Sequence, residues 1–262
     1  MITRLTVLSP ERFDRLRKSH YARRMLSNFS AYETGYEFCA FYEFQTEALA
    51  GIINIFNATM TAEVDALADL SAITEAEIAE LTQFILLNNP ATVEADKQLA
   101  LRVLEALGGL YKAEERTEFE FVERGEAAEM AVDELPPLET VFSILKTGFP
   151  AIAQAHGLWL TDTSHRIRRG LAQAFVYDGC TTATIQYIVH GVVLVGHVAT
   201  LPEFRGTLHA RRLLYRIGGK LAAEGFRVRL FARAHRVSYY EEIGFRAIGQ
   251  DIVLEPVCGA GG

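Results

Sequence analysis

A run of apolar residues, a polar turn and an amphipathic helix form the most informative pattern in the chain. The run Val192–Thr200 (VVLVGHVAT) predicts a buried β-strand, and Pro202 ends it because a proline cannot donate a backbone hydrogen bond. A turn at 203–207 (EFRGT) follows, and apolar residues then recur at helical spacing over 210–221, before Gly225. This order of strand, basic glycine-containing turn and helix directs backbone N–H groups at one place, which is typical of an anion site.

The remaining pattern alternates strands with helices in both halves of the chain. In the first half we expect strands at 2–8, 38–44, 51–56, 91–94 and 119–122, and helices after Ser9, at 75–87 and at 96–107. In the second half we expect a helix at 138–146 and strands at 170–177, 181–189 and 228–232, with a hairpin turn at Asp178-Gly179. The alternation predicts an α/β (α+β) fold with a mixed sheet.

An acidic stretch at 125–137, which contains a Pro-Pro pair and lacks periodicity, separates the two halves. Such a stretch is typical of a linker, so we expect one domain at 1–130 and a second at 131–262.

The two halves share an order of elements that predicts an internal repeat. In each half a glycine opens an apolar strand, two helices follow, and another glycine comes after the second helix. These glycines are Gly51 and Gly108 in the first half, 57 residues apart, and Gly191 and Gly244 in the second, 53 residues apart. A chance match stays open, because strand–helix–strand–helix is a common order.

Length and composition are those of an ordinary globular protein. The chain has 262 residues, of which 50% are hydrophobic and 23% are charged. No apolar run approaches the ~20 residues that span a bilayer, and the first ten residues lack the layout of a signal peptide. The three cysteines (Cys39, Cys180 and Cys258) have no metal-ligand spacing. We therefore expect a reduced, cytoplasmic protein with no metal and no membrane association.

The charge is distributed unevenly. The net charge is −7, but residues 1–135 carry 12 Lys and Arg against 24 Asp and Glu, whereas residues 136–262 carry 14 against 9. The basic half contains the predicted anion turn, as expected for a polyphosphate ligand, although chance and solvated faces give the same bias. We expect no nucleic-acid partner, because the arginines are not interleaved with aromatic residues in a known reader motif.

The turn and a segment downstream of it resemble the motifs of the GNAT superfamily of N-acetyltransferases. In that family a strand, a proline and an Arg/Gln-x-x-Gly-x-Gly/Ala turn precede the helix that holds the pyrophosphate of acetyl-CoA. Here the turn is Arg205–Ala210 (RGTLHA), with Leu208 in place of the central glycine, and Ser238–Phe245 (SYYEEIGF) is similar to the second family signature. The resemblance covers roughly 136–255. It implies a GNAT-like, mostly antiparallel central sheet flanked by helices, with a degenerate GNAT-like first half.

The resemblance also implies where acetyl-CoA binds as a co-substrate. Val198 and Thr200 would lend backbone groups to the pantetheine arm, with the Val198 N–H as oxyanion donor. The pyrophosphate would lie against Arg205, Gly206, Thr207, Leu208, His209 and Ala210. Tyr240 matches the tyrosine that protonates the departing thiolate, a role that suits a phenol of pKa about 10. Taken without the resemblance, the same residues also fit strand filling and core packing.

The sequence leaves the general base open. His197 has a suitable pKa near neutrality, but strand alternation places it opposite the oxyanion donor, and a lone histidine in an apolar strand is commonly a core residue. Asp162, His165 and Glu203 are other candidates, and the amine can also lose its proton to water. The basic stretch His165–Arg169 (HRIRR) fits either an acidic ligand, such as the 3′-phosphate of CoA, or a solvated loop.

Leu208 is the main departure from the family pattern. We expect it to have helical dihedrals and to turn its side chain into the core beside Leu213. Its N–H would then stay available, and acetyl-CoA would bind more weakly than to a glycine-containing turn.

Together these patterns predict an acetyl-CoA-dependent N-acyltransferase that moves an acetyl group to a primary amine by direct attack on the thioester, with Tyr240 as general acid. The acidic first half favours a cationic small-molecule or peptide amine as acceptor, in a cleft between the halves. We expect the first half itself to bind no cofactor, because it lacks the anion turn. The alternative is a non-catalytic acyl-CoA-binding pseudo-acetyltransferase or scaffold, which Leu208 would explain. The sequence does not specify the oligomeric state.

Overall fold

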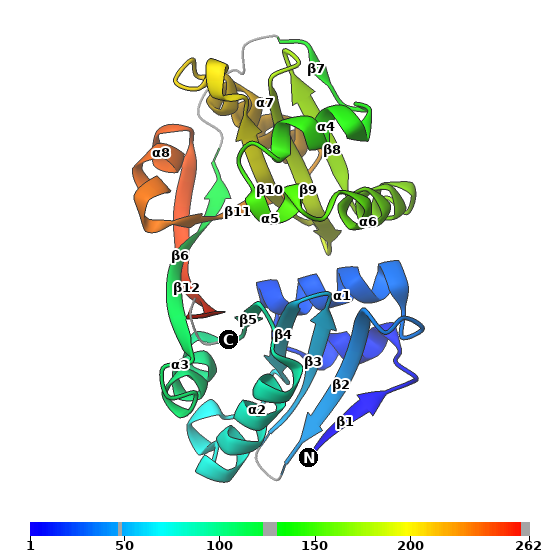
Figure 1. Cartoon of the computed structure of the whole chain (residues 1–262), viewed down its shortest axis with the longest axis vertical. Helices are drawn as coiled ribbons and strands as arrows, with labels where there is room; N and C mark the ends of the chain where they lie inside the picture. Colours follow the sequence, from blue (N-terminus) through cyan, green and yellow to red (C-terminus); the bar gives the residue numbers. More distant parts are fainter. Residues whose placement is uncertain (47–48, 123–129, 258–262) are drawn as a thin grey trace. The chain divides into compact units, whose positions relative to one another are not determined.

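Two long strands, β6 (Tyr111–Phe121) and β12 (Phe245–Pro256), determine how the chain divides in the computed structural model (Figure 1). Unit 1 consists of Met1–Arg116 and Gln250–Gly262, and unit 2 of Thr117–Gly249. The first residues of β6 and the last of β12 belong to unit 1, and the opposite ends belong to unit 2. Each unit is therefore completed by a strand that begins or ends in the other.

The structure describes residues 1–46, 49–122 and 130–257. Part of the expected linker, 125–129, lies outside these ranges, as does Cys258. The division predicted from the sequence, at residue 130, assigns each long strand to one half, whereas both strands are shared between the units. Among the described residues, no helix combines the length and the apolar character needed to cross a bilayer.

Unit 1 is a sheet with the strand order β1-β2-β3-β4-β5-β12-β6. Its own strands are β1 (Ile2–Leu5), β2 (Cys39–Gln45), β3 (Ala50–Phe56), β4 (Thr59–Val64) and β5 (Thr92–Glu94). Its helices are α1 (His20–Tyr32), α2 (Glu75–Asn88) and α3 (Lys97–Ala106), with the 3₁₀ turns η1 (Pro10–Arg15) and η2 (Leu70–Ala72). The strands β1 to β4 are antiparallel neighbours, and β4 runs parallel to β5.

Alternation along the strands of unit 1 separates two faces. On β4, Met60, Ala62 and Val64 join the apolar core beneath α2 and α3. Thr61 and Glu63 are buried on the opposite face, to which α1 turns its side chains. One face of the sheet is therefore apolar, and the other carries buried polar groups.

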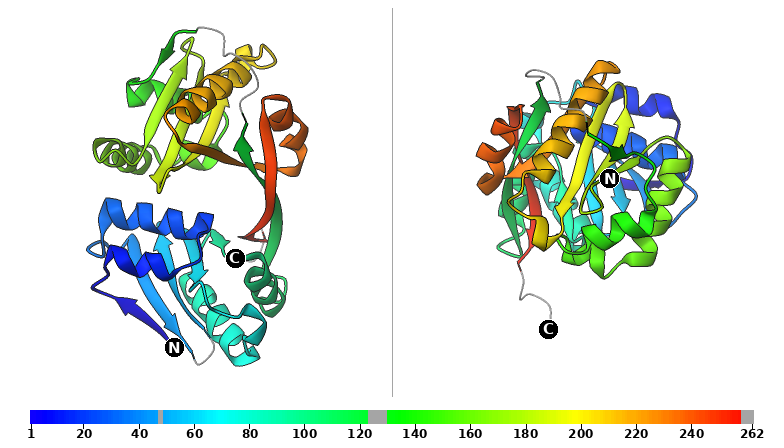
Figure 2. Two further views of the ribbon diagram at one scale, coloured as in Figure 1. Left: turned by 180° about the vertical axis from the view of Figure 1, so that it is seen from behind. Right: turned by 90° about the horizontal axis from the view of Figure 1, so that it is seen from above.

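Unit 2 has the strand order β12-β6-β11-β10-β9-β8-β7. Its own strands are β7 (Val132–Asp133), β8 (Gln173–Tyr177), β9 (Thr181–Val189), β10 (Val192–Thr200) and β11 (Arg227–Arg233). Its helices are α4 (Leu138–Leu145), α5 (Pro150–Ala153), α6 (His156–Arg168), α7 (His209–Ala223) and α8 (Val237–Glu242), with the 3₁₀ turns η3 (Pro202–Phe204) and η4 (Ala234–Arg236). Figure 1 shows α4 in front of the strands of this unit, and the reverse view in Figure 2 shows α7 in front of them.

The two units have the same topology, which confirms the predicted repeat. In both, three antiparallel strands lead through a helix to a strand parallel to the third, and a second helix follows. The counterpart of β10 is β4, whereas the strand that Gly51 opens is β3, the counterpart of β9. The glycine alignment of the two halves was therefore wrong by one strand, because the pattern TMTAEV of β4 was not predicted as a strand.

Local signals predicted several elements well. The capping box at α2 is confirmed, because the Thr74 hydroxyl accepts from the Glu77 N–H and the Glu77 carboxylate accepts from the Thr74 N–H. The Asp178-Gly179 turn is also confirmed, with φ of 52° and 63°. The helix α6 was missed, because the apolar run 158–160 hides its helical spacing.

A glycine on α7 shapes the core of unit 2. The ring of Phe121 lies against Gly218, and a Cβ atom there would lie 2.6 Å from the nearest ring carbon. At the neighbouring Gly219, no described atom would lie within 4 Å of such a Cβ. Gly218 therefore allows the close approach of β6 to α7.

We predict that Gly218→Ala lowers the free energy of unfolding by about 1–3 kcal/mol, because the buried Phe121 ring has to move. Gly219→Ala is the matched control on the same helix and should raise stability by up to about 1 kcal/mol, through its higher helix propensity. Urea unfolding followed by circular dichroism measures both. Equal stability of the two variants would contradict the prediction.

Candidate functional site

The parallel strands β10 and β11 separate after a short pairing. Their register ends at Leu194 opposite Arg229. Beyond this point β10 continues to Thr200 beside β9, and β11 continues to Arg233. We call residues 195–200 the separated segment of β10. It contains Val198 and Thr200, whose backbone groups would contact the pantetheine arm according to the GNAT resemblance.

A β-bulge bends the separated segment. Between Gly196 and Ala199 the register with β9 shifts, so that His197 and Val198 together oppose a single residue. His197 has φ of 49°, in the left-handed region. The bulge was not predicted, although Gly196 next to it is a glycine within a strand, which often marks a bulge.

His197 and Val198 point to opposite faces of the sheet, as alternation predicted. The His197 Nδ1 atom lies 3.3 Å from the Thr184 hydroxyl, and its ring packs at 5.4 Å from Phe149, on the face covered by α4. Val198 packs against the core beneath α7. The structure therefore does not bring the imidazole of His197 to the same face as Val198.

Arg205 folds back onto the main chain. Its Nε atom donates to the Thr200 carbonyl at 3.1 Å, and Nη2 donates to the Thr147 carbonyl at 3.1 Å. These bonds hold the turn against the end of β10 and the loop after α4. Gly206 follows with φ of 80°, a conformation that favours glycine.

Leu208 stands in the left-handed conformation immediately before α7, with φ of 66° and ψ of 8°. Its side chain is 54% exposed, whereas Leu213 is buried. The expected helical dihedrals and core packing of Leu208 were therefore wrong. A non-glycine residue in this region costs about 1 kcal/mol, so the turn keeps the shape that glycine would give it at an energetic cost.

The first turn of α7 has backbone donors without an intrahelical partner. The first helical bond runs from the Arg212 N–H to the Leu208 carbonyl, at 3.0 Å. No described side chain caps this end of the helix. The N–H groups of His209, Ala210 and Arg211 are therefore available as helix-end donors.

The His209 side chain is fixed beside the turn. Its Nδ1 atom lies 2.6 Å from the Thr207 hydroxyl, and Nε2 lies 3.3 Å from the Asp178 carboxylate. The ring packs against those of Tyr177 and Phe204, with centroids at 5.2 and 5.9 Å. Thr207 and His209, predicted from the motif, thus lie side by side.

Tyr240 lies on α8 among other aromatic rings. Its ring packs against Phe119 at 5.7 Å and Phe245 at 6.0 Å, and like Val198 it borders the core beneath α7. Burial, and then the neighbouring Tyr239, raise the pKa of Tyr240 to about 12. The hydroxyl therefore keeps its proton at neutral pH.

The other candidate bases have structural partners or lie outside this region. Asp162 accepts from Arg166 Nε at 2.7 Å on α6, and Arg166 is buried. His165 lies on the same helix, so the stretch predicted as a possible solvated loop is the last turn of α6. Glu203 is exposed in η3.

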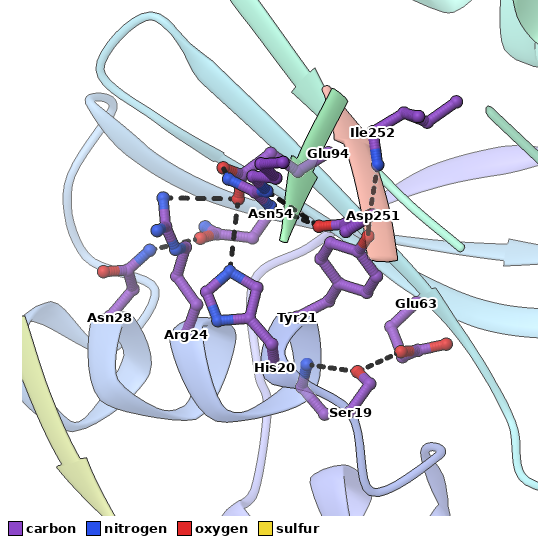
Figure 3. Close-up of polar contacts among 12 residues, drawn as sticks. Ser19, His20, Tyr21, Arg24, Asn28, Asn54, Glu63, Glu94, Asp251 and Ile252 are labelled. Atoms are coloured by element: carbon purple, nitrogen blue, oxygen red, sulfur yellow. Dashed lines mark hydrogen bonds and ion pairs between the residues drawn. The ribbon is translucent and has the colours of Figure 1, made fainter. Parts of the chain in front are cut away.

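Unit 1 contains a corresponding parallel pair, β4 and β5. Buried polar side chains occupy the place where the pairing of these strands ends. The register of β4 and β5 ends at Thr61 opposite Glu94. Figure 3 shows side chains of α1, among them His20 and Arg24, pointing toward Glu94, with Asp251 of β12 beside it. We call this group the polar cluster of unit 1.

Two arginines neutralise Glu94 at the centre of the polar cluster. Glu94 is 3% exposed, with Arg24 Nη1 at 3.2 Å and Arg116 Nη1 at 2.9 Å from its carboxylate. Burial alone would raise the pKa of Glu94, but the two guanidinium groups outweigh it and hold that pKa below its ordinary value. His20 Nε2 lies 3.9 Å from the same carboxylate.

Arg116 links Glu94 to a second buried carboxylate. Its Nη2 and Nε atoms lie 2.7 and 2.8 Å from the Asp251 carboxylate. The Tyr21 hydroxyl and the Ile252 N–H donate to the same carboxylate. Burial and the charge of Asp251 raise the pKa of Tyr21, so this hydroxyl remains a donor.

Glu63 is buried at the edge of the polar cluster with fewer partners. The Ser19 hydroxyl donates to its carboxylate, and the Val64 N–H donates at 2.9 Å. Burial raises the pKa of Glu63 to about 7, although both hydrogen bonds act in the opposite direction. Glu63 is therefore the titratable group of unit 1 nearest to neutrality among those with a resolved shift.

The turn of unit 1 that corresponds to the anion turn is acidic. Asp65 accepts from Arg12 Nη1 at 2.7 Å, and Asp69 caps η2. The helix α2 then begins with its own capping box and carries Glu75 and Glu77 in its first turn. Unlike the start of α7, this helix end is satisfied by its own side chains and repels anions.

Solved structures share the fold of the whole chain. No protein-family model matches the sequence, and no curated protein matches it either. A tandem GNAT protein from the clavulanic acid biosynthesis pathway superposes with a TM-score of 0.62 and 12% identity, over 100% of this chain and 99% of that one. A GNAT-family acetyltransferase from Colwellia psychrerythraea gives 0.55 and 12%, over 98% and 99%. A GCN5-related N-acetyltransferase-like protein from Streptococcus suis gives 0.57 and 11%, over 95% and 98%.

At these identities the similarity shows the fold. The chain has the fold of GNAT acetyltransferases in tandem form, with a mixed, mostly antiparallel sheet flanked by helices, which confirms the expected fold class.

Sequence reasoning missed the polar cluster entirely. Its members come from α1 and from four strands, β4, β5, β6 and β12, the last of which lies near the end of the chain. Only Glu63 and Glu94 carried a signal, since each is an acidic residue beside apolar positions in a short strand. Their burial depends on side chains more than a hundred residues away in sequence, such as Asp251.

Glu63 predicts a pH dependence of stability. In the folded protein the pKa of Glu63 is about 7, raised from 4.5, so folding favours the protonated carboxyl. The contribution of protonated Glu63 to the free energy of unfolding is therefore fully present below pH 4.5 and is lost as the pH rises through 7. Between pH 4.5 and 8 the wild type should therefore lose up to about 3 kcal/mol relative to Glu63→Gln. Urea unfolding at a series of pH values measures the difference. Glu105→Gln, at an exposed position of α3, is the control, and parallel curves for all three proteins would contradict the prediction.

Proposed function

We propose that unit 2 binds acetyl-CoA and that the chain is an N-acetyltransferase acting on a primary amine. The observation that carries the proposal is the separation of β10 from β11 next to a left-handed turn that opens α7. The GNAT fold of the chain supports the same class of reaction.

The residues of unit 2 suit an acyl-CoA. The separated segment of β10 offers backbone groups to the amides of a pantetheine arm, with Val198 as the proposed oxyanion donor. The pyrophosphate would lie against the turn from Arg205 to Ala210, where Gly206 and Leu208 have left-handed conformations and the helix end has no side-chain cap. Arg205 would act mainly by holding this turn, because its guanidinium is bound to main-chain carbonyls.

Acetyl-CoA supplies the acetyl group as a thioester. The amine nitrogen attacks the carbonyl carbon, a C–N bond forms, and the C–S bond breaks. Tyr240 donates its phenolic proton to the departing sulfur, and its raised pKa keeps that proton in place at neutral pH. Tyr240 and Val198 border the same core, which supports a shared role.

A cationic amine must lose one proton before it can attack and a second as the amide forms, and the second restores the phenol of Tyr240. The first proton needs a separate acceptor. His197 was one candidate for the acceptor of this proton, but its ring packs on the opposite face against Phe149. We therefore propose that water takes the proton and that His197 positions Val198 by forming the bulge. The acceptor we propose is a cationic small-molecule or peptide amine, given the excess of acidic residues in 1–135.

We further propose a single acetyl-CoA site in each chain. The counterpart turn in unit 1 is acidic, and the helix α2 caps itself. The polar cluster occupies the place where β4 and β5 end their pairing. Isothermal titration should give one acetyl-CoA per chain, and a stoichiometry of two would contradict this proposal.

Substitutions of Leu208 test whether the turn before α7 binds acetyl-CoA. We expect Leu208→Gly to bind acetyl-CoA up to about fivefold more tightly, because it clears the exposed side chain from the turn. The backbone strain of about 1 kcal/mol is present in the free and the bound protein alike, so its removal should raise the free energy of unfolding and leave the affinity unchanged. Leu208→Ala separates the two effects, because it shortens the side chain and retains the strain. Titration calorimetry measures the affinities. No binding by the wild type at millimolar acetyl-CoA would overturn the acyltransferase proposal, whereas binding without turnover of any amine would favour the non-catalytic alternative.

Tyr240 tests the chemistry. We expect Tyr240→Phe to lower turnover about 100-fold, because the leaving sulfur loses its proton donor, and to change acetyl-CoA affinity by no more than a few fold. Tyr239→Phe is the neighbouring control and should retain turnover. Release of CoA thiol in the presence of an amine measures the rate. Equal turnover of Tyr240→Phe and the wild type would remove Tyr240 from the mechanism.

A further inference from the structure

Three side chains with different metal-binding groups meet beside the turn of unit 2. They are Asp178 and Cys180, at the turn between β8 and β9, and His209, the first residue of α7. The carboxylate oxygen, the thiol sulfur and the imidazole nitrogen all lie within 4.8 Å of one another. The cysteine spacing gave no hint of this group, because one cysteine contributes and the histidine comes from a distant helix.

The imidazole of His209 is oriented for a ligand at Nε2. The Thr207 hydroxyl lies 2.6 Å from Nδ1, so the second nitrogen points away from this bond toward Asp178. The ring is 13% exposed and lies between two aromatic rings, which fix its plane. Metal-bound histidines commonly have their other nitrogen fixed by a hydrogen bond in this way.

The distance between the imidazole and the carboxylate already fits a metal ion. Asp178 Oδ2 and His209 Nε2 are 3.3 Å apart. Two ligands on one tetrahedral zinc ion, with bonds of about 2.0–2.1 Å, lie about 3.3 Å apart. The Asp178 side chain is mostly exposed, so it can adjust to an ion at little cost.

The thiol of Cys180 is buried and its main chain is fixed. Its side chain is 1% exposed, and Sγ lies 3.7 Å from both the Tyr177 carbonyl and the Thr181 hydroxyl. Its carbonyl accepts from the Leu201 N–H at 2.9 Å, which ties it to the end of β10. Binding needs Sγ to approach the other two atoms by up to about 1 Å, to the roughly 3.6 Å expected of zinc-bound sulfur and nitrogen.

We propose that Asp178, Cys180 and His209 bind one Zn²⁺ ion with a fourth position open to water. A thiolate with an imidazole and a carboxylate is a ligand set that favours zinc over magnesium or calcium. The thiol of Cys180 gives its proton to solvent when the ion binds. The ion would link the turn between β8 and β9 to the start of α7 and so hold the turn at 205–208 in place. An ion pair of His209 with Asp178 explains two of these residues but not the thiol.

The test uses the full-length protein after treatment with a chelator, in the absence of acetyl-CoA. Cobalt(II) is the probe, because a cobalt–thiolate bond gives a charge-transfer band that imidazole and carboxylate ligands do not give. We expect one Co²⁺ per chain with this band, and its loss on addition of one equivalent of Zn²⁺. Zn²⁺ should also raise the melting temperature of the wild type.

Variants assign the ligands. Cys180→Ser should abolish the charge-transfer band, and Asp178→Asn, at an exposed position, should lower the Co²⁺ affinity about 10–100-fold without loss of the fold. His190→Asn is the control, because His190 follows the opposite end of β9 and asparagine tolerates its left-handed conformation. It should bind Co²⁺ as the wild type does.

Two results would overturn the site. One is the absence of a thiolate band in the wild type with Co²⁺ in excess, and the other is a band of full strength in Cys180→Ser. The titration contains no acetyl-CoA, so failure of the metal site leaves the acyl-transfer proposal intact. Equally, absence of acetyl-CoA binding does not affect the cobalt result.

Discussion

Main-chain groups need partners where the pairing of two parallel strands stops, and each unit of this chain contains such a place. In unit 2 both β10 and β11 continue beyond it, whereas in unit 1 the strand β5 ends there. The register ends at Thr61 opposite Glu94 in unit 1 and at Leu194 opposite Arg229 in unit 2. Backbone N–H and C=O groups away from water have to be satisfied by side chains, by other strands or by a ligand. Unit 1 and unit 2 meet this requirement in different ways. Unit 1 uses its own buried side chains, whereas unit 2 contains the candidate site.

In unit 1, the charged side chains of the polar cluster fill the place where the pairing of β4 and β5 ends. Carboxylates such as Asp251 accept main-chain N–H groups, and arginines from α1 and β6 neutralise the buried negative charge. A buried ionic network costs desolvation and is stable only when every member has its partner. Its presence explains how a unit with the same topology differs in chemistry from its counterpart. The acidic turn that follows β4 acts in the same sense, because it repels the polyphosphate that the counterpart turn would attract.

In unit 2, the region where the pairing of β10 and β11 ends is shaped mainly by unusual main-chain conformations. The bulge at His197, the turn at Gly206 and the left-handed Leu208 bend the backbone, and Leu208 provides no side-chain cap for α7. An anion at this helix end would give partners to the uncapped N–H groups. Tyr240 is buried among aromatic rings, and its raised pKa means that it keeps its proton at neutral pH. The proposed acyl transfer and the proposed zinc site both use this region.

The sequence by itself determined the elements whose signals are local. The strand, turn and helix from Val192 to Gly225, the capping box at Thr74 and the hairpin turn at Asp178 all follow from residues within a few positions of one another. The motif at 205–210 also predicted a cofactor site, which stays a prediction. The tertiary structure alone decided the strands shared between the units, the exposed left-handed Leu208 and the burial of Glu63. The shared strands and the burial of Glu63 depend on groups far apart in the chain, which come together only after the sheet has formed. The conformation of Leu208 was missed for another reason, because its residue type does not favour positive φ.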